Sequence, residues 1–171
     1  MSLSLGVSIA ASLCFIAAVL WAAVADLVTM TIRNQLVLVL LAGYVVLAPL
    51  SGMGWADIGW SIAVAVGVLA GMFVLFGFGW IGGGDAKFAA VIALWLGADQ
   101  APAYVLCTAL FGGILTIFLL QFRVRVLPAQ CLTVPWIMRL HAPETGVPYG
   151  VAIAAAALFI FPETYWMKAL A

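Results

Sequence analysis

The 171-residue sequence contains very little charge. Only 7% of its residues are Asp, Glu, Lys or Arg, and six basic residues balance six acidic ones. Soluble globular domains carry about 25% charged residues, so a chain of this composition cannot cover its surface with polar groups. Six scattered cations also cannot form the basic face that nucleic-acid binding requires. The low charge therefore excludes a soluble globular domain and a nucleic-acid-binding protein.

The sequence is also poor in residues that hold metals or form covalent intermediates. It has a single histidine, His141, and three isolated cysteines, Cys14, Cys107 and Cys131. It contains no HExxH zinc motif, no CxxC pair and no Gly-x-Ser-x-Gly nucleophile motif. These absences argue against zinc, redox and serine chemistry. We therefore expect neither a metal nor another cofactor.

Hydrophobic residues make up 68% of the chain and lie in long uncharged runs. Five runs reach the roughly 18 to 20 residues that a transmembrane helix needs, and a sixth run is too short to cross by itself. The runs cover residues 1–25, 34–56, 58–84, 88–98, 100–122 and 145–162. The bilayer is therefore the expected solvent of this protein.

The basic residues decide whether the short run also crosses. If all six runs cross, five of the six basic residues lie on one side of the membrane and only Lys168 lies on the other. Cytoplasmic loops carry such an excess of Lys and Arg. We therefore predict an all-α, multi-pass membrane protein with six transmembrane helices in a single domain, 1–171, and with both termini on the non-cytoplasmic side. The expected crossings are about 3–25, 35–50, 58–80, 83–98, 101–122 and 146–162, with a cytoplasmic loop at about 123–145.

Two segments need a separate interpretation. Residues 23–25 form an A-x-A pattern of the kind that signal peptidases cleave, but no Lys or Arg precedes the apolar stretch, which is longer than that of a signal peptide. We expect this first segment to be a transmembrane helix. Residues 123–145 mix arginines with apolar side chains, and we expect them to lie on the cytoplasmic headgroup surface.

The predicted topology separates the six acidic residues into two groups. One group lies at the outer ends of helices, where a solvated carboxylate marks only a membrane boundary: Asp57, Asp99 and Glu163. The other group lies on the cytoplasmic side: Asp26, Asp85 and Glu144. The chain makes two complete crossings between Asp26 and Asp85, so we expect these two carboxylates to reach the same membrane face.

The pair Asp26 and Asp85 suggests a specific chemistry. Two carboxylates in a partly dry site do not both ionise easily, so one retains a proton while the other acts as a base. Such a pair activates a water molecule and protonates the departing amine of a peptide, as in an aspartic protease. This chemistry needs no metal, which agrees with the absence of metal-binding motifs.

Each feature of the pair also has a structural interpretation. Asp85 precedes Ala-Lys-Phe-Ala-Ala and suits the N-cap of the fourth helix, a role that is compatible with catalysis. Asp26 lies near the C-terminal end of the first helix, where the macrodipole disfavours an anion, so capping does not explain it. Gly82, Gly83 and Gly84 leave room either for an extended peptide or for a simple turn between helices.

Three segments resemble motifs of the prepilin peptidases, a family of intramembrane aspartic proteases. Gly82–Asp85, with Lys87 two residues later, resembles the GxGD signature. Asp26–Asn34 resembles the first motif of the family, with Arg33 in place of the usual proline. Val147–Gly150 resembles the motif of the last helix. The three segments follow one another in the expected order over nearly the whole chain.

The resemblance implies an activity and a site. Asp26 and Asp85 would be the catalytic pair of an aspartic endopeptidase without a metal or other cofactor. The residues that would shape the substrate site are Gly82, Gly83, Gly84, Lys87, Asn34, Pro148 and Gly150. Asn34 is in addition expected to be the N-cap of the second helix.

The resemblance also implies substrates, partners and a location. The enzyme would remove the basic leader peptide of prepilins or pseudopilins at the cytoplasmic face of the bacterial inner membrane, in contact with lipid and upstream of the pilus assembly machinery. The sequence lacks the zinc-binding cysteine cluster of bifunctional members. It therefore resembles the minimal branch that serves tight-adherence (Tad/Flp) pili, in which methyltransferase activity is not expected.

Two other classes of membrane protein stay open at this point. A transporter or proton-conducting subunit would use Asp26 and Asp85 to relay ions, although such residues usually lie near the bilayer midplane and such proteins often contain repeats. A structural subunit of a membrane complex would leave the three motifs unexplained. Loss of substrate cleavage on substitution of either aspartate distinguishes a peptidase from both classes.

Overall fold

The computed structural model describes residues 3–170, and over that range the chain forms helices joined by turns and loops, without strands. The α-helices are α1 (Leu3–Thr29), α2 (Asn34–Leu50), α3 (Trp55–Gly77), α4 (Gly83–Leu96), α5 (Ala101–Arg123), α6 (Pro135–His141), α7 (Tyr149–Ile160) and α8 (Tyr165–Lys168). Two 3₁₀ helices complete the chain, η1 (Ala129–Thr133) and η2 (Phe161–Glu163). The predicted all-α class is confirmed.

The described part of the chain contains four helical segments that are long and apolar enough to cross a membrane: residues 4–29, 55–77, 101–123 and 149–168. They make the chain a multi-pass membrane protein by length and composition. α2 is also apolar but has 17 residues, and α4 has 14. At 1.5 Å per residue, α4 extends about 21 Å, which is shorter than a hydrocarbon core of about 30 Å.

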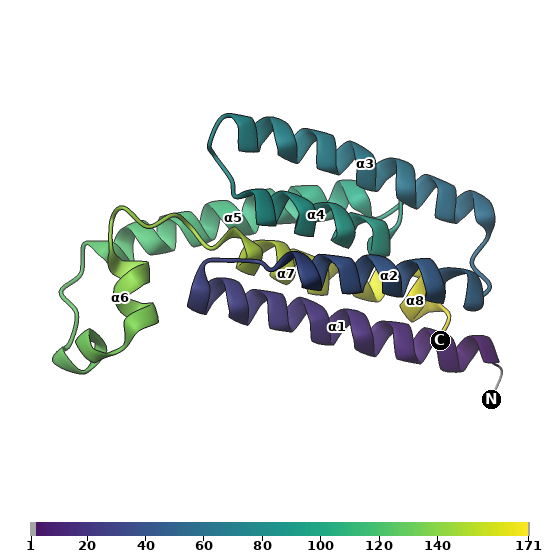
Figure 1. Ribbon diagram of the computed structural model, residues 1–171, viewed down its shortest axis with the longest axis horizontal. Helices are drawn as coiled ribbons and strands as arrows, with labels where there is room; N and C mark the ends of the chain where they lie inside the picture. Colours follow the sequence, from purple (N-terminus) through teal and green to yellow (C-terminus); the bar gives the residue numbers. More distant parts are fainter. Residues whose placement is uncertain (1–2, 171) are drawn as a thin grey trace.

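The longer helices run back and forth between two ends of an elongated bundle (Figure 1). We name these ends by what lies there. The α6 end contains the last turn of α1, the first turns of α4 and α7, and α6 itself. The terminal end contains the beginning of α1 and the short helix α8, so the segments near both chain termini lie together (Figure 1).

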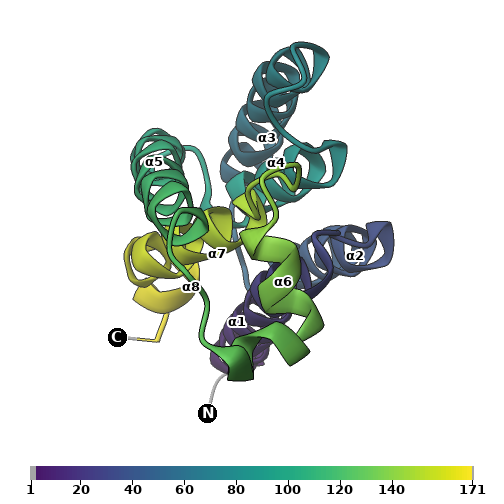
Figure 2. The same cartoon turned by 90° about the vertical axis from the view of Figure 1, so that its left-hand side faces the viewer.

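α4 and α7 lie at the centre of the bundle. α4 packs against α2, α3, α5 and α7, and α7 packs against α1, α4 and α5. The view along the bundle shows α4 between α3 and α2, and α7 between α5 and α1 (Figure 2). Both central helices are rich in buried alanine. Small side chains let helix backbones approach closely where the solvent outside is hydrocarbon, which explains why these two helices occupy the centre.

The outer helices expose large apolar side chains. α3 is the clearest example, because only 6% of its most hydrophobic 18-residue stretch is buried within the protein. Its exposed residues include Trp60, Val66, Phe73 and Val74. A continuous apolar surface of this kind favours aggregation in water but suits contact with lipid chains.

Aromatic residues fasten the terminal end. The ring of Trp95 in α4 lies 5.3 Å from that of Phe15 in α1 and 5.1 Å from that of Trp166 in α8. The indole N–H of Trp95 donates to the carbonyl of Leu40 at 2.9 Å, and that of Trp166 donates to the carbonyl of Trp95 at 2.9 Å. Because each buried indole has a hydrogen-bond partner, this cluster connects four helices without an unsatisfied donor.

Two of the predicted helix caps are wrong. α2 begins at Asn34 itself, with Arg33 in the cap position and no side-chain cap. α4 begins two residues before Asp85, because Gly83 and Gly84 are already helical and Gly82 is the cap. Asp85 instead occupies the first turn, where the helix dipole also favours a carboxylate. Arg33 has a φ of −71°, which is close to the value that a proline imposes, so the linker keeps that conformation without the ring.

Candidate active site

Asp26 lies in the last turn of α1 and is only 4% exposed. Its Oδ2 atom accepts a hydrogen bond of 2.8 Å from the amide of Gly150, the second residue of α7. The first amides of a helix have no partner within the helix and carry its positive dipole end. Asp26 therefore satisfies the beginning of a helix that is 124 residues away in the sequence.

Asp85 lies near the same amide. It is half-buried in the first turn of α4, and its Oδ2 atom accepts a hydrogen bond of 3.3 Å from the amide of Gly82. Its carboxyl group also lies close enough to Asp26 for the two charges to interact. The structure thus brings Asp26 and Asp85 together at the α6 end, next to the start of α7.

Gly150 is tightly enclosed by Asp26. A Cβ atom at this position would lie 2.8 Å from Oδ2 of Asp26 and 3.0 Å from its Cβ, so any side chain would displace the carboxylate. Pro148, two residues earlier, is buried and holds the cap position of α7 with a φ of −73°. Pro148 therefore directs the chain into α7, and Gly150 lets the start of α7 approach Asp26.

The linker between α1 and α2 lies across the site. After Thr29 the chain turns at Met30, whose φ of 55° is unusual for a residue with a side chain. The half-buried Ile32 follows. Its carbonyl oxygen lies 3.2 Å from where a Cβ of Gly84 would be, and its Cδ1 atom lies 2.7 Å from where a Cβ of Gly150 would be. Ile32 therefore contacts the first turns of both α4 and α7.

The three glycines before Asp85 each lie against a different neighbour. A Cβ on Gly82 would lie 2.9 Å from Oδ2 of Asp85, and one on Gly83 would lie 3.4 Å from the ring of Phe76. Gly84 lies against the backbone of Ile32, as described above. The run of glycines therefore lets the end of α3 and the α1–α2 linker approach the start of α4.

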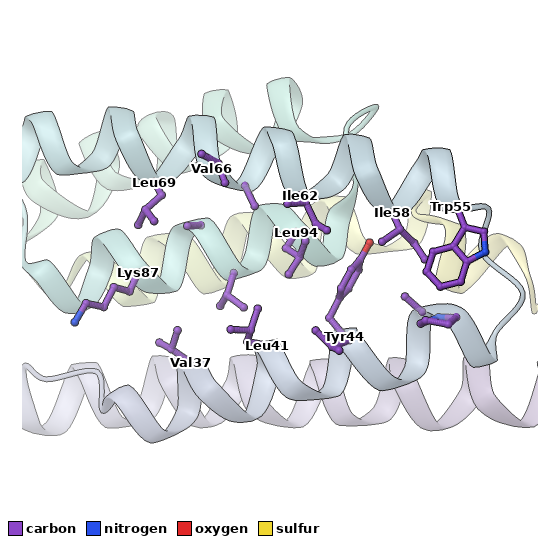
Figure 3. Close-up of a pocket in the computed structure, with 16 residues that line it drawn as sticks. Val37, Leu41, Tyr44, Trp55, Ile58, Ile62, Val66, Leu69, Lys87 and Leu94 are labelled. Carbon is purple, nitrogen blue, oxygen red and sulfur yellow. The ribbon is translucent and has the colours of Figure 1, made fainter.

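Lys87 and Asn34 are bonded to each other, beside the aspartate site. Two positions along a helix correspond to about 200° of rotation, so Lys87 points away from Asp85. Its Nζ atom donates a hydrogen bond of 3.2 Å to Oδ1 of Asn34, which connects α4 to the start of α2. Both residues are exposed. Lys87 lines a groove on that side of α4 (Figure 3).

Two arginines fasten the loop between α5 and α7 to the rest of the α6 end. The guanidinium of Arg123 donates to the carbonyls of Leu140, Thr145 and Gly146 at 2.9, 2.6 and 2.9 Å. Arg139 donates to the carbonyl of Val28, two residues after Asp26, at 2.5 Å. A cation at this carbonyl end of α1 is favoured by the helix dipole.

Several of these residues were missed by the sequence reasoning. Ile32, Arg123 and Arg139 all position parts of the site, but the sequence marked the arginines only as basic loop residues. The signal for Ile32 is weak: one apolar side chain between the polar residues Thr31 and Arg33. The contacts of all three residues depend on segments that are distant in the sequence.

The carboxylates of the terminal end are arranged differently. Asp57, Asp99 and Glu163 are exposed and line a hollow of about 460 Å³ together with Lys168. Within the described residues, no three His, Cys, Asp or Glu side chains converge in the way that a metal site requires. The terminal end therefore has carboxylates without a site built around them.

Comparison with known proteins adds a family to this geometry. Residues 13–117 match the type IV leader peptidase family. No curated protein and no solved structure matches the chain. The matched range contains Asp26, Asp85 and the three glycines but ends before α7, so the role of Gly150 rests on the structure alone.

Proposed function

This chain belongs to the type IV leader peptidase family, which makes it a leader-cleaving peptidase of the membrane, and we propose that Asp26 and Asp85 are its catalytic pair. The observation that supports this assignment is that the two carboxyl groups lie close enough for their charges to interact, beside the Gly150 amide that donates to Asp26. Asp26 has no role within its own helix, and its burial is costly for a charged group. A catalytic role explains why it is there.

The proposed reaction is general acid–base hydrolysis of a peptide bond. The low polarity of the site and the closeness of the two groups favour one shared proton, so one carboxylate is a base and its partner an acid. The base takes a proton from water, whose oxygen attacks the peptide carbonyl, while the acid protonates the carbonyl oxygen. The carboxyl group that took the proton from water then donates it to the leaving amine. As the C–N bond breaks, the carboxylate of the other residue takes a proton back from a hydroxyl group of the intermediate, which regenerates the pair. The hydrogen bond from the Gly150 amide keeps Asp26 in place.

We further propose that all six segments cross the inner membrane of a bacterium as a single domain, with the α6 end in the cytoplasm and both termini outside. The distribution of basic residues supports this orientation. Those that the helices bring to the α6 end are Arg33, Lys87, Arg123, Arg125 and Arg139. Such clustering is typical of the cytoplasmic face. The short helix α4 then begins just inside that face, with Asp85 in its first turn.

The proposed substrate follows from the position of the site. A peptidase at the cytoplasmic face can cut a single-span protein at the boundary between a basic cytoplasmic leader and an apolar stem. We propose a prepilin or pseudopilin of the Tad/Flp type, released by cleavage to the pilus assembly machinery. Only leader removal, without methylation of the product, is part of the proposal.

Coexpression tests this function directly. The chain is expressed with each candidate prepilin of its own genome, and the products are separated on a gel and analysed by N-terminal sequencing. We expect a shortened prepilin that begins at the stem, and no shortening with the Asp26→Asn or Asp85→Asn variant. An inserted wild-type protein that leaves every candidate intact would contradict the proposal and favour an ion-relay role for the two aspartates.

A further inference from the structure

A long apolar groove lies between α2 and α3, with α4 as its floor (Figure 3). α2 and α3 each lie beside α4 and make little contact with each other, so the space between them, about 500 Å³, stays open. Residues from all three helices line it, including Leu41, Ile62, Val66 and Leu94. Lys87 is the one charged side chain among the described residues that line it.

We propose that this groove binds the apolar stem helix of the substrate while the bond to be cleaved lies at Asp26 and Asp85. The inference rests on the proposed function and adds to it the place where the enzyme recognises the membrane-embedded part of its substrate. Three observations support it: the direction of the groove, its continuity with the aspartate site, and its single charge.

The direction and length of the groove suit a helix. It runs along the bundle, from Lys87 at the α6 end to Trp55 at the terminal end (Figure 3). The α3 residues that line it extend from Trp55 to Leu69, a stretch of fifteen residues that is about 21 Å long as a helix. Apolar grooves of this kind bind a helix through side chains spaced at i, i+3 or i+4, and i+7.

The groove begins beside the aspartate site. Asp85 and Lys87 lie on opposite sides of the first turn of α4, so a chain that passes over this turn leads from one site to the other. Gly82, Gly83 and Gly84 form the start of this turn, and Gly82 is exposed. Backbone without side chains permits such a close passage. A stem cleaved at the cytoplasmic face must continue from there into the bilayer, which is the direction that the groove takes.

The charge of Lys87, at the α6 end of the groove, determines how the substrate stem is aligned along the groove. Lys87 is exposed and donates to the neutral amide oxygen of Asn34, which leaves its positive charge without neutralisation by that bond. At the edge of hydrocarbon, an ammonium group attracts an anionic partner strongly. We therefore expect the bound stem to carry an acidic side chain close to its start. A lipid chain would fill the same groove without such a requirement.

Photocrosslinking tests where the stem binds. A photoreactive residue replaces Leu41 or Val66 in the groove, or Leu110 on the exposed face of α5 as a control, in the full-length Asp85→Asn protein. The probe is the prepilin that the wild-type protein cleaves in the coexpression assay. We expect crosslinks to the uncleaved prepilin from both groove positions and not from α5. Crosslinks from the groove only to lipid or to a second copy of this chain would overturn the inference.

Filling the groove provides a kinetic test. Ala65 of α3 lines the groove, whereas Ala63 is exposed on another face of the same helix. We expect Ala65→Phe to raise the KM for the prepilin about tenfold with little change in kcat, and Ala63→Phe to change neither by more than about twofold, because only the former occupies the space that the stem needs. Equal kinetics of the two variants would overturn the inference.

Exchanging the charges of Lys87 and of its expected acidic partner tests how the stem is aligned in the groove. Lys87→Glu is expected to slow cleavage, and a lysine in place of the first acidic residue of the stem is expected to restore it, because the exchange recovers an opposite-charge pair. If cleavage by the wild type is normal but neither the filling nor the exchange has an effect, the groove proposal fails and the peptidase stands. If the wild type cleaves no prepilin, the proposed function itself fails.

Discussion

The two ends of the bundle both carry carboxylates, but only the α6 end builds a site around them. There, Asp26 is 4% exposed, accepts a hydrogen bond from the Gly150 amide and lies close to Asp85. At the terminal end, Asp57, Asp99 and Glu163 are exposed around a hollow. The comparison teaches that a carboxylate in a membrane protein acquires chemistry from desolvation and from convergence with a second group, not from its place at a helix end.

The two ends also differ in how they are held together. The terminal end is stabilised by contacts between large aromatic side chains and by hydrogen bonds from indole N–H groups to carbonyls of neighbouring helices. The α6 end is held by glycine contacts, by the linker residue Ile32 and by the arginine bonds of a loop. The α6 end therefore depends on close approaches between backbone segments, whereas the terminal end depends on packed aromatic side chains beside its hollow.

The largest expected effect comes from the proposed catalytic pair, Asp26 and Asp85. Asp26→Asn and Asp85→Asn each remove one proton-transfer group while keeping the shape of the side chain, so we expect prepilin cleavage to slow by about 10² to 10⁴-fold or more. Initial rates in detergent or nanodiscs measure this effect, with membrane insertion checked on the same preparations. An Asp85→Asn variant within tenfold of the wild type would refute the pair and remove the main difference between the two ends.

A second prediction concerns Gly150, whose amide donates a hydrogen bond to Asp26. The Cβ atom of a Gly150→Ala variant would lie 2.8 Å from Oδ2 of Asp26 and displace it, so we expect about a 10²-fold loss of cleavage rate from mispositioning. Gly113→Ala in α5 is the matched control, because nothing lies within 4 Å of its Cβ position.

The Gly113 variant should keep its activity, since alanine is favoured over glycine in a helix. Full activity of Gly150→Ala would show that the position of Asp26 does not depend on the start of α7.

A smaller effect is expected from the loop that closes the α6 end. Arg139→Ala removes the hydrogen bond to the carbonyl of Val28 beside Asp26, a contact of about 1 kcal/mol, so we expect a threefold to tenfold loss of cleavage rate. Arg125→Ala removes the same charge from an exposed position in the same loop and is the control. Equal rates for the two variants would show that only the charge of the loop matters.

The helices, and the membrane face that each acidic residue reaches, could be predicted from the sequence because they depend only on the number of uncharged runs. The uncharged runs indicate helices, and the number of crossings between two residues decides whether they reach the same face, whatever their packing. Asp26 and Asp85 were therefore predicted as a pair before any contact was known. This reasoning needs no knowledge of distances.

The details of the site could not be predicted in the same way, because they arise from contacts between distant segments. The hydrogen bond from Gly150 to Asp26 spans 124 positions, and that from Arg139 to Val28 spans 111. The caps of α2 and α4 were wrong because capping patterns identify residue types and not the turn at which a helix begins. Lys87 was expected to shape the substrate site, but the side of α4 on which it lies depends on helical rotation, which places it along the groove.

The smallest effect is expected from a substitution at the terminal end of the bundle, Asp99→Asn. Asp85 lies in the first turn of α4 and Asp99 follows its end, and the 11 helical positions from Asp85 to Leu96 correspond to about 17 Å along the helix. This separation is about twice the screening length at physiological salt, roughly 8 Å, and the exposed Asp99 is solvated. We therefore expect Asp99→Asn to cleave prepilin within about twofold of the wild type. A tenfold loss, measured in the same assay as the Asp85→Asn variant, would mean that the terminal end takes part in the reaction, because α4 would then transmit the change over its whole length.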